Sequence, residues 1–441
     1  MFQFLLRRPV TSLILAFAIT VLIGAIFLKL PSATTNGISF LDALFTSTSA
    51  TCVTGLMVKD TGTTFTLFGQ MVILFLIQIG GLGIMTGAAF ILLLFKRLGI
   101  KAGAGFKTIL EEEYISETKK IIKFIILSTF ILEAIGAIFL FFHWRGNFLN
   151  FGQLTFNSLF HSISAFCNAG FSLFKNSLEN FRGDVFTNVI ISSLIILGGI
   201  GFLVLEDFYR KITSFLKRQK AKFSLHSKIV LITTVFLILL GASLFYFFER
   251  GNLSYLSQKE MVLSSFFQSI TRTCGFSTVN IGELSPPTIF VLMFLMFVGG
   301  APGSVAGGIK VISLALIFLS IISFFKRKEE VVVFGKTIPK IKFRNVFILV
   351  SVYLMFSLVI FLLLLYTERV NFEKILFEIF SAMGTVGLST GITPYLTTIG
   401  KILIIITIFT GRLLPLSIAI LASRELAKPK IIYPEEKIIL G

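Results

Sequence analysis

SATCVTGL, residues 49–56, is the stretch that decides the fold, because the chain repeats its pattern three more times. The later copies are SAFCNAGF at 164–171, SITRTCGF at 269–276 and SAMGTVGL at 381–388. Each copy has a glycine six residues after its serine, and these glycines are Gly55, Gly170, Gly275 and Gly387. Steps of 115, 105 and 112 residues separate them, so the copies divide the chain almost evenly. A fourfold repeat of a polar turn predicts four walls around one axis.

The rest of the chain is too apolar for a soluble protein. Its 441 residues are 55% hydrophobic with a mean hydropathy of +0.92, whereas soluble domains are about 45–50% apolar. Segments long enough to cross a hydrocarbon core of ~30 Å fall at 9–30, 66–95, 121–142, 185–209, 227–248, 286–323, 344–366 and 397–423. The first segment is longer than the roughly 7–15 residues of a signal-peptide core, so we expect it to be a retained helix.

Successive pairs of these segments bracket one glycine signature each. Every signature follows ten to fifteen apolar and small residues, a run too short to span a bilayer. A re-entrant half-helix fits such a run, because irregular backbone at membrane depth must be buried in protein or line water. We therefore expect an all-α polytopic membrane protein with eight spanning helices and four re-entrant pore helices around a pseudo-fourfold central pore. The expected span–pore-loop–span repeats are 1–98, 99–218, 219–327 and 328–441.

The distribution of positive charge predicts the orientation in the membrane. Of 40 Lys and Arg, 27 lie in the N-terminus, in segments 96–123, 210–228 and 326–344, and in the C-terminal tail. By the positive-inside rule these parts are cytoplasmic, as are both termini, and the signatures enter from outside the cell membrane. The net charge of +18 is spread over short loops beside apolar spans. This pattern favours contact with anionic lipid headgroups over nucleic acid.

Glycine at the centre of each signature predicts a cation filter. Glycine permits a positive φ, so consecutive carbonyls can turn toward one axis and replace the hydration shell of a monovalent cation. The negative dipole end of each half-helix favours a cation at the same place. The expected filter residues are Val53, Thr54, Gly55, Asn168, Ala169, Gly170, Thr273, Cys274, Gly275, Thr385, Val386 and Gly387. We expect the signature serines Ser49, Ser164, Ser269 and Ser381 to cap or pack the pore helices rather than contact the ion.

The motifs ATCVTGL, FCNAGF, TRTCGF and GTVGL together resemble the Trk/Ktr/HKT superfamily of potassium transporters over essentially the whole chain. The length resembles that of the membrane subunit of a bacterial Ktr system. The resemblance implies potassium uptake with a preference for potassium, since all four filter glycines are present. It also implies a homodimer on a ring of separate cytoplasmic nucleotide-binding subunits of the RCK/KTN type. Nucleotide would then act only through that partner, and whether sodium drives transport stays open.

Residues 299–310, GGAPGSVAGGIK, predict a break in the sixth apolar segment. Glycine costs about 1 kcal/mol and proline about 3 kcal/mol inside a helix, and this stretch has five glycines and one proline. A phosphate-binding loop is excluded because Lys310 follows isoleucine and no strand precedes the stretch. The interpretation that this loop only accommodates a kink stays open, whereas the resemblance implies an intramembrane gate beneath the filter. Its expected residues are Gly299, Gly300, Pro302, Gly303, Ser304, Gly307, Gly308 and Lys310, with Arg412 of the last segment.

Other glycines and charges within the apolar segments carry weaker expectations. Gly80, Gly198 and Gly411 lie 25, 28 and 24 residues after their filter glycines, as Gly299 lies 24 after its own. Arg412 is expected to face a water-filled cavity below the filter, because a charge inside a membrane is costly and usually functional. We expect Arg272 to pair with a pore-helix end behind the filter, and Glu133 to pair with a neighbouring helix.

Enzymatic and metal chemistry find no support in the sequence. The three cysteines, Cys52, Cys167 and Cys274, are expected to pack behind the filter, because they do not share one depth as a tetrahedral metal site needs. No nucleophile, base and oxyanion set is present, and no cofactor fingerprint. Sodium or ammonium conduction stays open within the same class. A small-solute carrier built from inverted repeats is disfavoured, because two spans plus a re-entrant loop keep all four units in one orientation. A membrane anchor for a cytoplasmic assembly leaves the four signatures unexplained.

Overall fold

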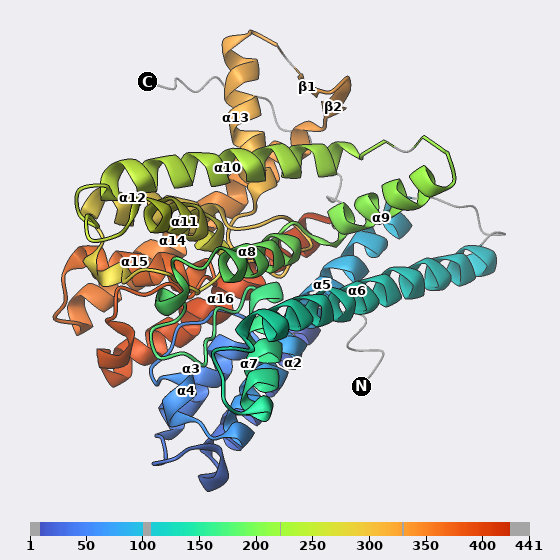
Figure 1. The fold of residues 1–441 in the computed structure, drawn as a ribbon. Coiled ribbons are helices and arrows are strands. Elements are labelled where there is room, and N and C mark those ends of the chain that lie inside the picture. Colours follow the sequence, from blue (N-terminus) through green and yellow to red (C-terminus); the bar gives the residue numbers. More distant parts are fainter. Residues whose placement is uncertain (1–8, 100–106, 221, 329, 424–441) are drawn as a thin grey trace.

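The computed structural model describes residues 9–99, 107–220, 222–328 and 330–423, and these are mostly helical (Figure 1). The helices outside the signature runs are α2 (Pro9–Lys29), α5 (Leu67–Gly99), α6 (Lys107–Trp144), α8 (Val185–Gly199), α9 (Phe202–Leu216), α10 (Leu225–Glu249), α12 (Pro286–Val298), α13 (Val311–Phe325), α14 (Lys340–Thr367) and α16 (Thr398–Ser423), together with the four-residue α4 (Thr61–Thr64). Four short helices of 12 to 16 residues precede the signatures, namely α3 (Phe40–Thr51), α7 (Phe151–Phe166), α11 (Gln258–Ile270) and α15 (Phe372–Met383). A small hairpin pairs β1 (Val331–Val333) with β2 (Lys336–Ile338).

Six helices in the described ranges are long and apolar enough to cross a membrane, or seven if one bent pair counts as a single span. The six are α2, α5, α6, α10, α14 and α16. Of the eight predicted apolar segments, the sixth is divided as expected into α12 and α13, which have 13 and 15 residues. The protein is thus a helical multi-pass membrane protein. The predicted repeat boundaries stay predictions, and Arg7, Arg8 and the basic tail after 423 lie outside the described residues.

The prediction of one continuous fourth span over 185–209 is wrong. α8 and α9 meet at a 104° bend. Gly201 between them has a φ of +85°, which L side chains disfavour. The carbonyl oxygen of Gly199 accepts a hydrogen bond from the backbone N–H of Ala301 at 2.9 Å, and Phe202 N–H donates to the carbonyl of Gly303 at 3.1 Å. The fourth span therefore breaks because the glycine-rich loop takes up backbone groups that a continuous helix would use.

The four short helices α3, α7, α11 and α15 occupy the runs that precede the signatures. Three of them begin at a side-chain cap, on Ser39, Asn150 and Ser257. Ser257 and Glu260 form a capping box at α11, and hydrogen bonds from Ser257 hold the pKa of the Glu260 carboxyl below its usual value. All four helices end within a few residues of a signature glycine, so their C-terminal carbonyls point toward the signatures.

A recurrent glycine contact fixes three of the short helices against the preceding long helix. Gly24, Gly136 and Gly241 each lie where a Cβ would meet a serine hydroxyl of the short helix and a leucine of the following helix. These serines donate to backbone carbonyls of the long helix at 2.7, 2.6 and 2.8 Å. The serines are Ser47, Ser162 and Ser269. Glycine is needed here because helix and short helix approach closely.

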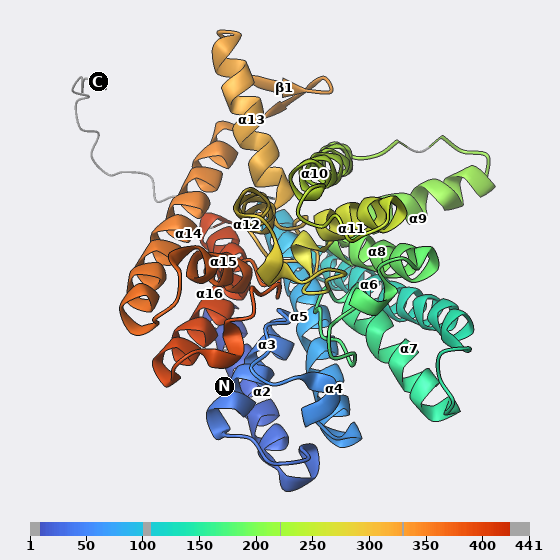
Figure 2. The same ribbon diagram turned by 60° about the vertical axis from the view of Figure 1, so that its left-hand side comes forward.

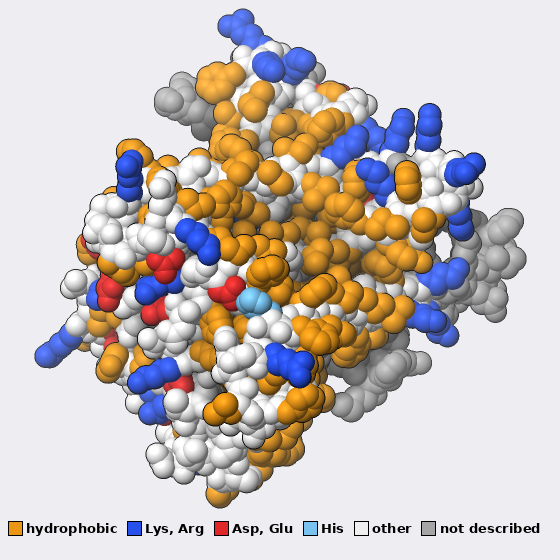
Figure 3. Space-filling model, viewed as in Figure 1, with side chains coloured by type: hydrophobic (Ala, Val, Ile, Leu, Met, Phe, Trp, Pro, Cys, Tyr) orange, Lys and Arg blue, Asp and Glu red, His pale blue; other side chains and the backbone are white. Residues whose placement is uncertain are grey.

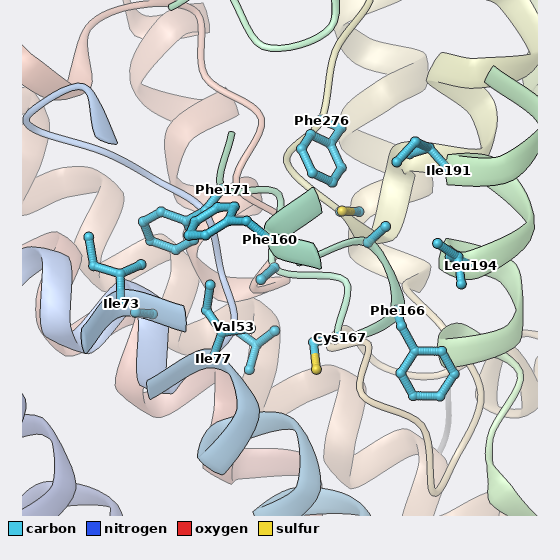
Figure 4. Packing of buried hydrophobic residues seen from close by; sticks show 14 of the residues in the cluster. Val53, Ile73, Ile77, Phe160, Phe166, Cys167, Phe171, Ile191, Leu194 and Phe276 are labelled. Carbon is cyan, nitrogen blue, oxygen red and sulfur yellow. The ribbon is translucent and has the colours of Figure 1, made fainter. Parts of the chain in front are cut away.

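The elements follow one another around a central region where loops meet, from blue through green and yellow to red (Figure 2). Buried side chains from several of these elements fill the space between α5, α7 and α8, among them Val53, Cys167 and Phe276 (Figure 4). On the outside, hydrophobic side chains form a broad band, and Lys and Arg gather near α9 and the far end of α13 (Figure 3). This pattern fits an apolar belt with a basic face at one edge.

Candidate functional site

The four signature glycines lie in one closed ring. A Cβ built on Gly55 would overlap the carbonyl of Ala169, and one on Gly170 would overlap the backbone of Gly275. A Cβ on Gly275 would lie 3.0–3.1 Å from the backbone of Gly387, and one on Gly387 would overlap the carbonyl of Thr54. Each segment therefore touches the next, and the fourth touches the first. The ring brings together residues up to 333 positions apart in the chain, Thr54 and Gly387.

The backbone takes the same conformation in three of the four segments. Gly55, Gly170 and Gly387 have φ values of +97°, +69° and +96°. The residue two before each of them also has positive φ, namely Val53, Asn168 and Thr385. Conformations with positive φ are costly for residues with a side chain, and they persist where the surroundings enforce them.

The third segment departs from this pattern, so the expectation of a positive φ at Gly275 is wrong. Gly275 is absent from the described residues with positive φ. α11 continues into a 3₁₀ turn over Thr271–Thr273, and Cys274 is extended with φ −150°. The helical conformation thus runs closer to the glycine than in the other segments. The close approach still favours glycine here, because an added Cβ would lie 3.0–3.1 Å from the backbone of Gly387.

The backbone N–H groups and the backbone carbonyl groups of the segments differ in their hydrogen bonding. N–H groups donate back to the short helices: Thr54 to Ser49 at 2.7 Å, Ala169 to Ser164 at 2.8 Å, and Val386 to Ser381 at 2.9 Å. By contrast, no carbonyl oxygen of the twelve expected filter residues accepts a hydrogen bond from another described residue. All twelve residues except Thr273 and the glycines are at most 1% exposed. Buried carbonyls are normally paired, so this arrangement is unusual.

The signature serines bind backbone groups, as expected. The hydroxyl oxygens of Ser49 and Ser381 accept hydrogen bonds from the N–H groups of Gly55 and Gly387, both at 3.0 Å. Ser164 Oγ donates to the carbonyl of Phe171 at 2.8 Å. Ser269 instead donates to the carbonyl of Ile238 on α10. The difference agrees with the displaced helix end in the third segment.

The loop 299–310 packs against the fourth segment and against the bend between α8 and α9. A Cβ on Gly307 would overlap the carbonyl of Gly384 and the hydroxyl of Thr385. Val305 N–H donates to the carbonyl of Gly198 at 3.3 Å. The loop folds back on itself, since Gly300 N–H donates to the carbonyl of Gly307 at 3.3 Å. It is therefore an ordered segment held by backbone hydrogen bonds from two sides.

Arg412 and Lys310 lie beside this loop. Arg412 Nη1 donates to the carbonyl oxygen of Val305 at 2.5 Å and to Thr385 Oγ1 at 3.4 Å. The other two guanidinium nitrogens have no hydrogen-bond partner within the described ranges. Lys310 Nζ donates to the carbonyl of Ala306, so its partner is a backbone group of the loop itself. Both side chains line a cavity of 230 Å³, and the expectation that Arg412 faces a cavity fits this geometry.

Of the expected pairings of Glu133 and Arg272, the first is confirmed and the second is wrong. Glu133 on α6 accepts a hydrogen bond from Gln78 Nε2 on α5 at 3.1 Å, as expected, and Cys167 Sγ lies 3.7 Å from its other oxygen. Arg272 was expected to pair with a pore-helix end, and the structure contradicts this expectation. Its Nε and Nη1 atoms find no partner among the described residues. The displaced end of α11 carries Arg272 into a small cavity of 20 Å³ that Thr273 and Gly300 also line.

The repeated glycines of the long helices pack against the short-helix ends. A Cβ on Gly80, Gly198 or Gly411 would overlap the carbonyl oxygen of Thr51, Phe166 or Met383 respectively, in each case the last residue of a short helix. Gly299 meets the backbone of its own loop instead, at Gly307. The sequence spacing that links these four glycines therefore marks one kind of contact in three of them, and the loop replaces it in the fourth.

Three polar side chains near the filter were missed in the sequence. His161, Gln268 and Glu378 lie on the short helices and reach the residues just past the glycines. A signal was present, because a serine follows two residues after three of the glycines, in GFS, GFS and GLS. The cysteines are free and buried, as expected of packing residues. Within the described ranges, no group of three or more His, Cys, Asp or Glu could hold a metal ion.

The chain matches the family described as "TrkH: Cation transport protein" over residues 8–433. It is 39% identical to the Ktr system potassium uptake protein B of Bacillus subtilis over 440 residues, which cover 98% of this chain and 97% of that protein. It is 38% identical to the Ktr system potassium uptake protein B of Vibrio alginolyticus, with 97% and 94% covered. The potassium/sodium uptake protein NtpJ of Enterococcus hirae is 36% identical, with 98% and 97% covered.

A solved structure has the same fold. The crystal structure of the potassium transporter TrkH from Vibrio parahaemolyticus superposes with a TM-score of 0.72 and covers 92% of this chain and 83% of that one. At 21% sequence identity the likeness concerns the fold alone.

Proposed function

Because the chain belongs to the TrkH family of cation transport proteins, we propose that it takes up potassium through a filter made by its four glycine segments. The observation that carries the proposal is the closed ring of these segments, whose buried carbonyls accept no hydrogen bond from a described residue. Inward carbonyls can replace the water around a potassium ion. The relatives named as potassium uptake proteins are similar over almost their whole length, which supports the choice of ion.

The arrangement of helices favours a cation over an anion. The C-terminal ends of α3, α7 and α15 lie next to the ring, where their partial negative charge stabilises a cation. The positive φ at three glycines and at the residues two before them allows consecutive carbonyls to face one direction. We therefore assign the twelve residues around Gly55, Gly170, Gly275 and Gly387 to the filter.

In this proposal the loop 299–310 is the gate, and Arg412 holds it closed. The loop lies between the filter and the cavity of 230 Å³. Its small residues leave room for movement, and the hydrogen bond from Arg412 to Val305 holds it in place. A fixed positive charge below the filter also raises the barrier to a passing cation. Displacement of the loop would remove both obstacles together.

Orientation and assembly belong to the same proposal. The basic segments 210–228 and 326–344 face the cytoplasm by the positive-inside rule, and so do both termini. The two Ktr relatives above are named as parts of a system, which supports a further protein component. We propose that the chain forms a homodimer that docks through these basic segments to a separate nucleotide-binding ring. Gentle purification should then retain such a soluble partner, and its repeated loss would argue against this part.

Rubidium influx into liposomes that contain the purified chain tests the function. Competition with potassium, sodium and ammonium, with and without an imposed sodium gradient, identifies the ion and any coupling. We expect saturable influx that potassium blocks and sodium barely affects. Equal block by sodium would favour the potassium/sodium behaviour named for the Enterococcus relative. Absence of influx from both the full chain and a variant lacking loop residues 301–306 would exclude the pore.

A further inference from the structure

Three of the four segments continue past the filter glycine into the same tight turn. A serine lies two residues beyond the glycine, and these serines are Ser172, Ser277 and Ser389. Each hydroxyl oxygen accepts a hydrogen bond from the backbone N–H two residues further on, at 3.0, 3.2 and 2.9 Å. The serine thus closes a small turn at the mouth of the filter. The first segment has Met57 at this position.

A side chain from the adjacent short helix holds each of these serines. His161 Nε2 on α7 lies 3.1 Å from Ser172 Oγ. Gln268 Nε2 on α11 donates to Ser277 Oγ at 2.6 Å, and Glu378 Oε1 on α15 accepts from Ser389 Oγ at 2.5 Å. The three helix side chains are at most 1% exposed. Three chemically different residues therefore make the same kind of contact, each with the serine of its own segment.

These side chains occupy equivalent positions once the longer helical stretch of the third segment is taken into account. His161 and Glu378 are nine residues before their filter glycines, whereas Gln268 is seven before its own. The 3₁₀ turn Thr271–Thr273 extends the third helix toward the glycine and accounts for the difference. In the first segment the same place is taken by Thr46, whose hydroxyl donates to the carbonyl of Asp42 on its own helix at 2.9 Å.

Glu378 makes the most extensive of these contacts. Its Oε1 atom also accepts from the backbone N–H of Thr390 at 3.0 Å, and its Oε2 atom accepts from Thr393 Oγ1 at 2.9 Å. On the other side of the glycine, Ser381 of the same helix binds the N–H of Gly387 at 3.0 Å. The fourth filter segment is therefore tied to α15 both before and after its glycine.

We propose that His161, Gln268 and Glu378 are positioning residues that fix the outer mouth of the filter and thereby set its ion preference. The proposal rests on the filter described under Proposed function. Discrimination between cations depends on how the carbonyls are placed, and functional groups must be held to within about 0.5 Å by their supports. A segment tied at one end only would let the carbonyls follow a smaller ion.

Glu378→Ala, Glu378→Gln and Ser389→Ala test this in the rubidium influx assay. The measured quantity is the ratio of the sodium to the potassium concentration that halves influx. We expect a fall of about tenfold in Glu378→Ala, because several buried hydrogen bonds are lost, and a fall of the same sign in Ser389→Ala. Glu378→Gln keeps one oxygen acceptor and should preserve most of the ratio. Thr46→Val is the matched control, since that hydroxyl does not reach the mouth, and should leave the ratio unchanged.

An unchanged ratio in folded Glu378→Ala and Ser389→Ala would overturn the proposal. Hydrogen exchange over residues 387–393 separates this outcome from failure of the proposed function. If the parent chain carries no potassium-selective flux, the proposed function fails, while exchange still reports the tie. We expect faster exchange at the N–H of Thr390 in Glu378→Ala and not in Thr46→Val, and equal exchange in both would contradict the tie itself.

Discussion

Gly275 and Gly387 are neighbours in the ring, but the two positions favour glycine for different reasons. Gly387 combines a φ of +96° with a close approach to the carbonyl of Thr54. Gly275 has an ordinary φ, and an added Cβ would lie 3.0–3.1 Å from Gly387. At Gly387 a side chain meets both backbone strain and a rigid carbonyl, whereas at Gly275 a shift of a few tenths of an ångström relieves the contact.

We therefore expect Gly387→Ser to reduce preference for potassium over sodium much more than Gly275→Ser. Strained φ alone costs roughly 1–3 kcal/mol, which would correspond to a change of about fivefold to a hundredfold in the selectivity ratio. Gly251→Ala is the control, because nothing lies within 4 Å of its added Cβ. The measurement is rubidium influx competed with sodium and potassium. Equal effects of the two serine variants would contradict the conformational difference between the segments.

Arg412 carries the second prediction at this scale. Its hydrogen bond to the carbonyl of Val305 is the side-chain tie that α16 makes to the loop in the described structure. A hydrogen bond from a charged group contributes about 1.5–3 kcal/mol, so Arg412→Gln should raise the rubidium influx rate by roughly tenfold. Lys401→Gln, on the same helix and remote from the loop, should not raise it. A lower rate in Arg412→Gln would mean that the charge assists passage rather than restraining the loop.

At the scale of elements, certain glycines of the long helices face the C-terminal ends of the short helices. These glycines decide how closely a long helix and a short helix approach. Gly80 on α5 lies against the carbonyl of Thr51, while Gly83, three residues on, has only a distant ring contact at 3.8 Å. Glycine is unfavourable inside a helix. Its presence at Gly80 is thus explained by the approach of the short helix, and its presence at Gly83 is not.

Gly80→Ala should therefore destabilise the protein, and Gly83→Ala should not. Overpacking against a rigid carbonyl costs roughly 1–3 kcal/mol, whereas Gly83→Ala gains helix propensity at a place with space for the methyl group. Thermal unfolding of the purified chain in detergent measures both. We expect a lower Tm for Gly80→Ala and an equal or higher Tm for Gly83→Ala. An unchanged Tm in Gly80→Ala would show that α5 can shift away from α3.

The elements also show where the sequence was sufficient. The break at 299–310 could be predicted, because five glycines and a proline act locally on a helix. The break in the fourth span could not be predicted in this way. It depends on hydrogen bonds that Gly199 and Phe202 form with Ala301 and Gly303, about 100 positions away in the chain. The displaced third segment was hidden for a related reason. SITRTCGF keeps the glycine spacing of the other copies, so the spacing gives no sign of the 3₁₀ turn over Thr271–Thr273.

At the scale of the whole molecule, the chain closes on itself between its first and last parts. Lys401 Nζ on α16 lies 2.7 Å from Asp42 Oδ1 on α3, across 359 residues of sequence. The side chains are 17% and 10% exposed. A second ion pair, Arg182 with Glu260, joins the loop before α8 to α11 at 3.4 Å, but its side chains are 37% and 28% exposed. The two ion pairs therefore differ mainly in burial, since the side chains of Lys401 and Asp42 are less exposed than those of Arg182 and Glu260.

We expect Lys401→Gln to lower stability by roughly 1–3 kcal/mol, because it leaves a largely buried carboxylate without its partner. Arg182→Gln should cost less than about 1 kcal/mol, as exposed pairs do. Thermal unfolding of the single variants and of Asp42→Asn with Lys401→Gln forms a double-mutant cycle. A coupling of about 1 kcal/mol or more between Asp42 and Lys401 would make this pair a determinant of ring closure. Additive single effects would mean instead that contacts between the filter segments alone hold the last quarter of the chain against the first.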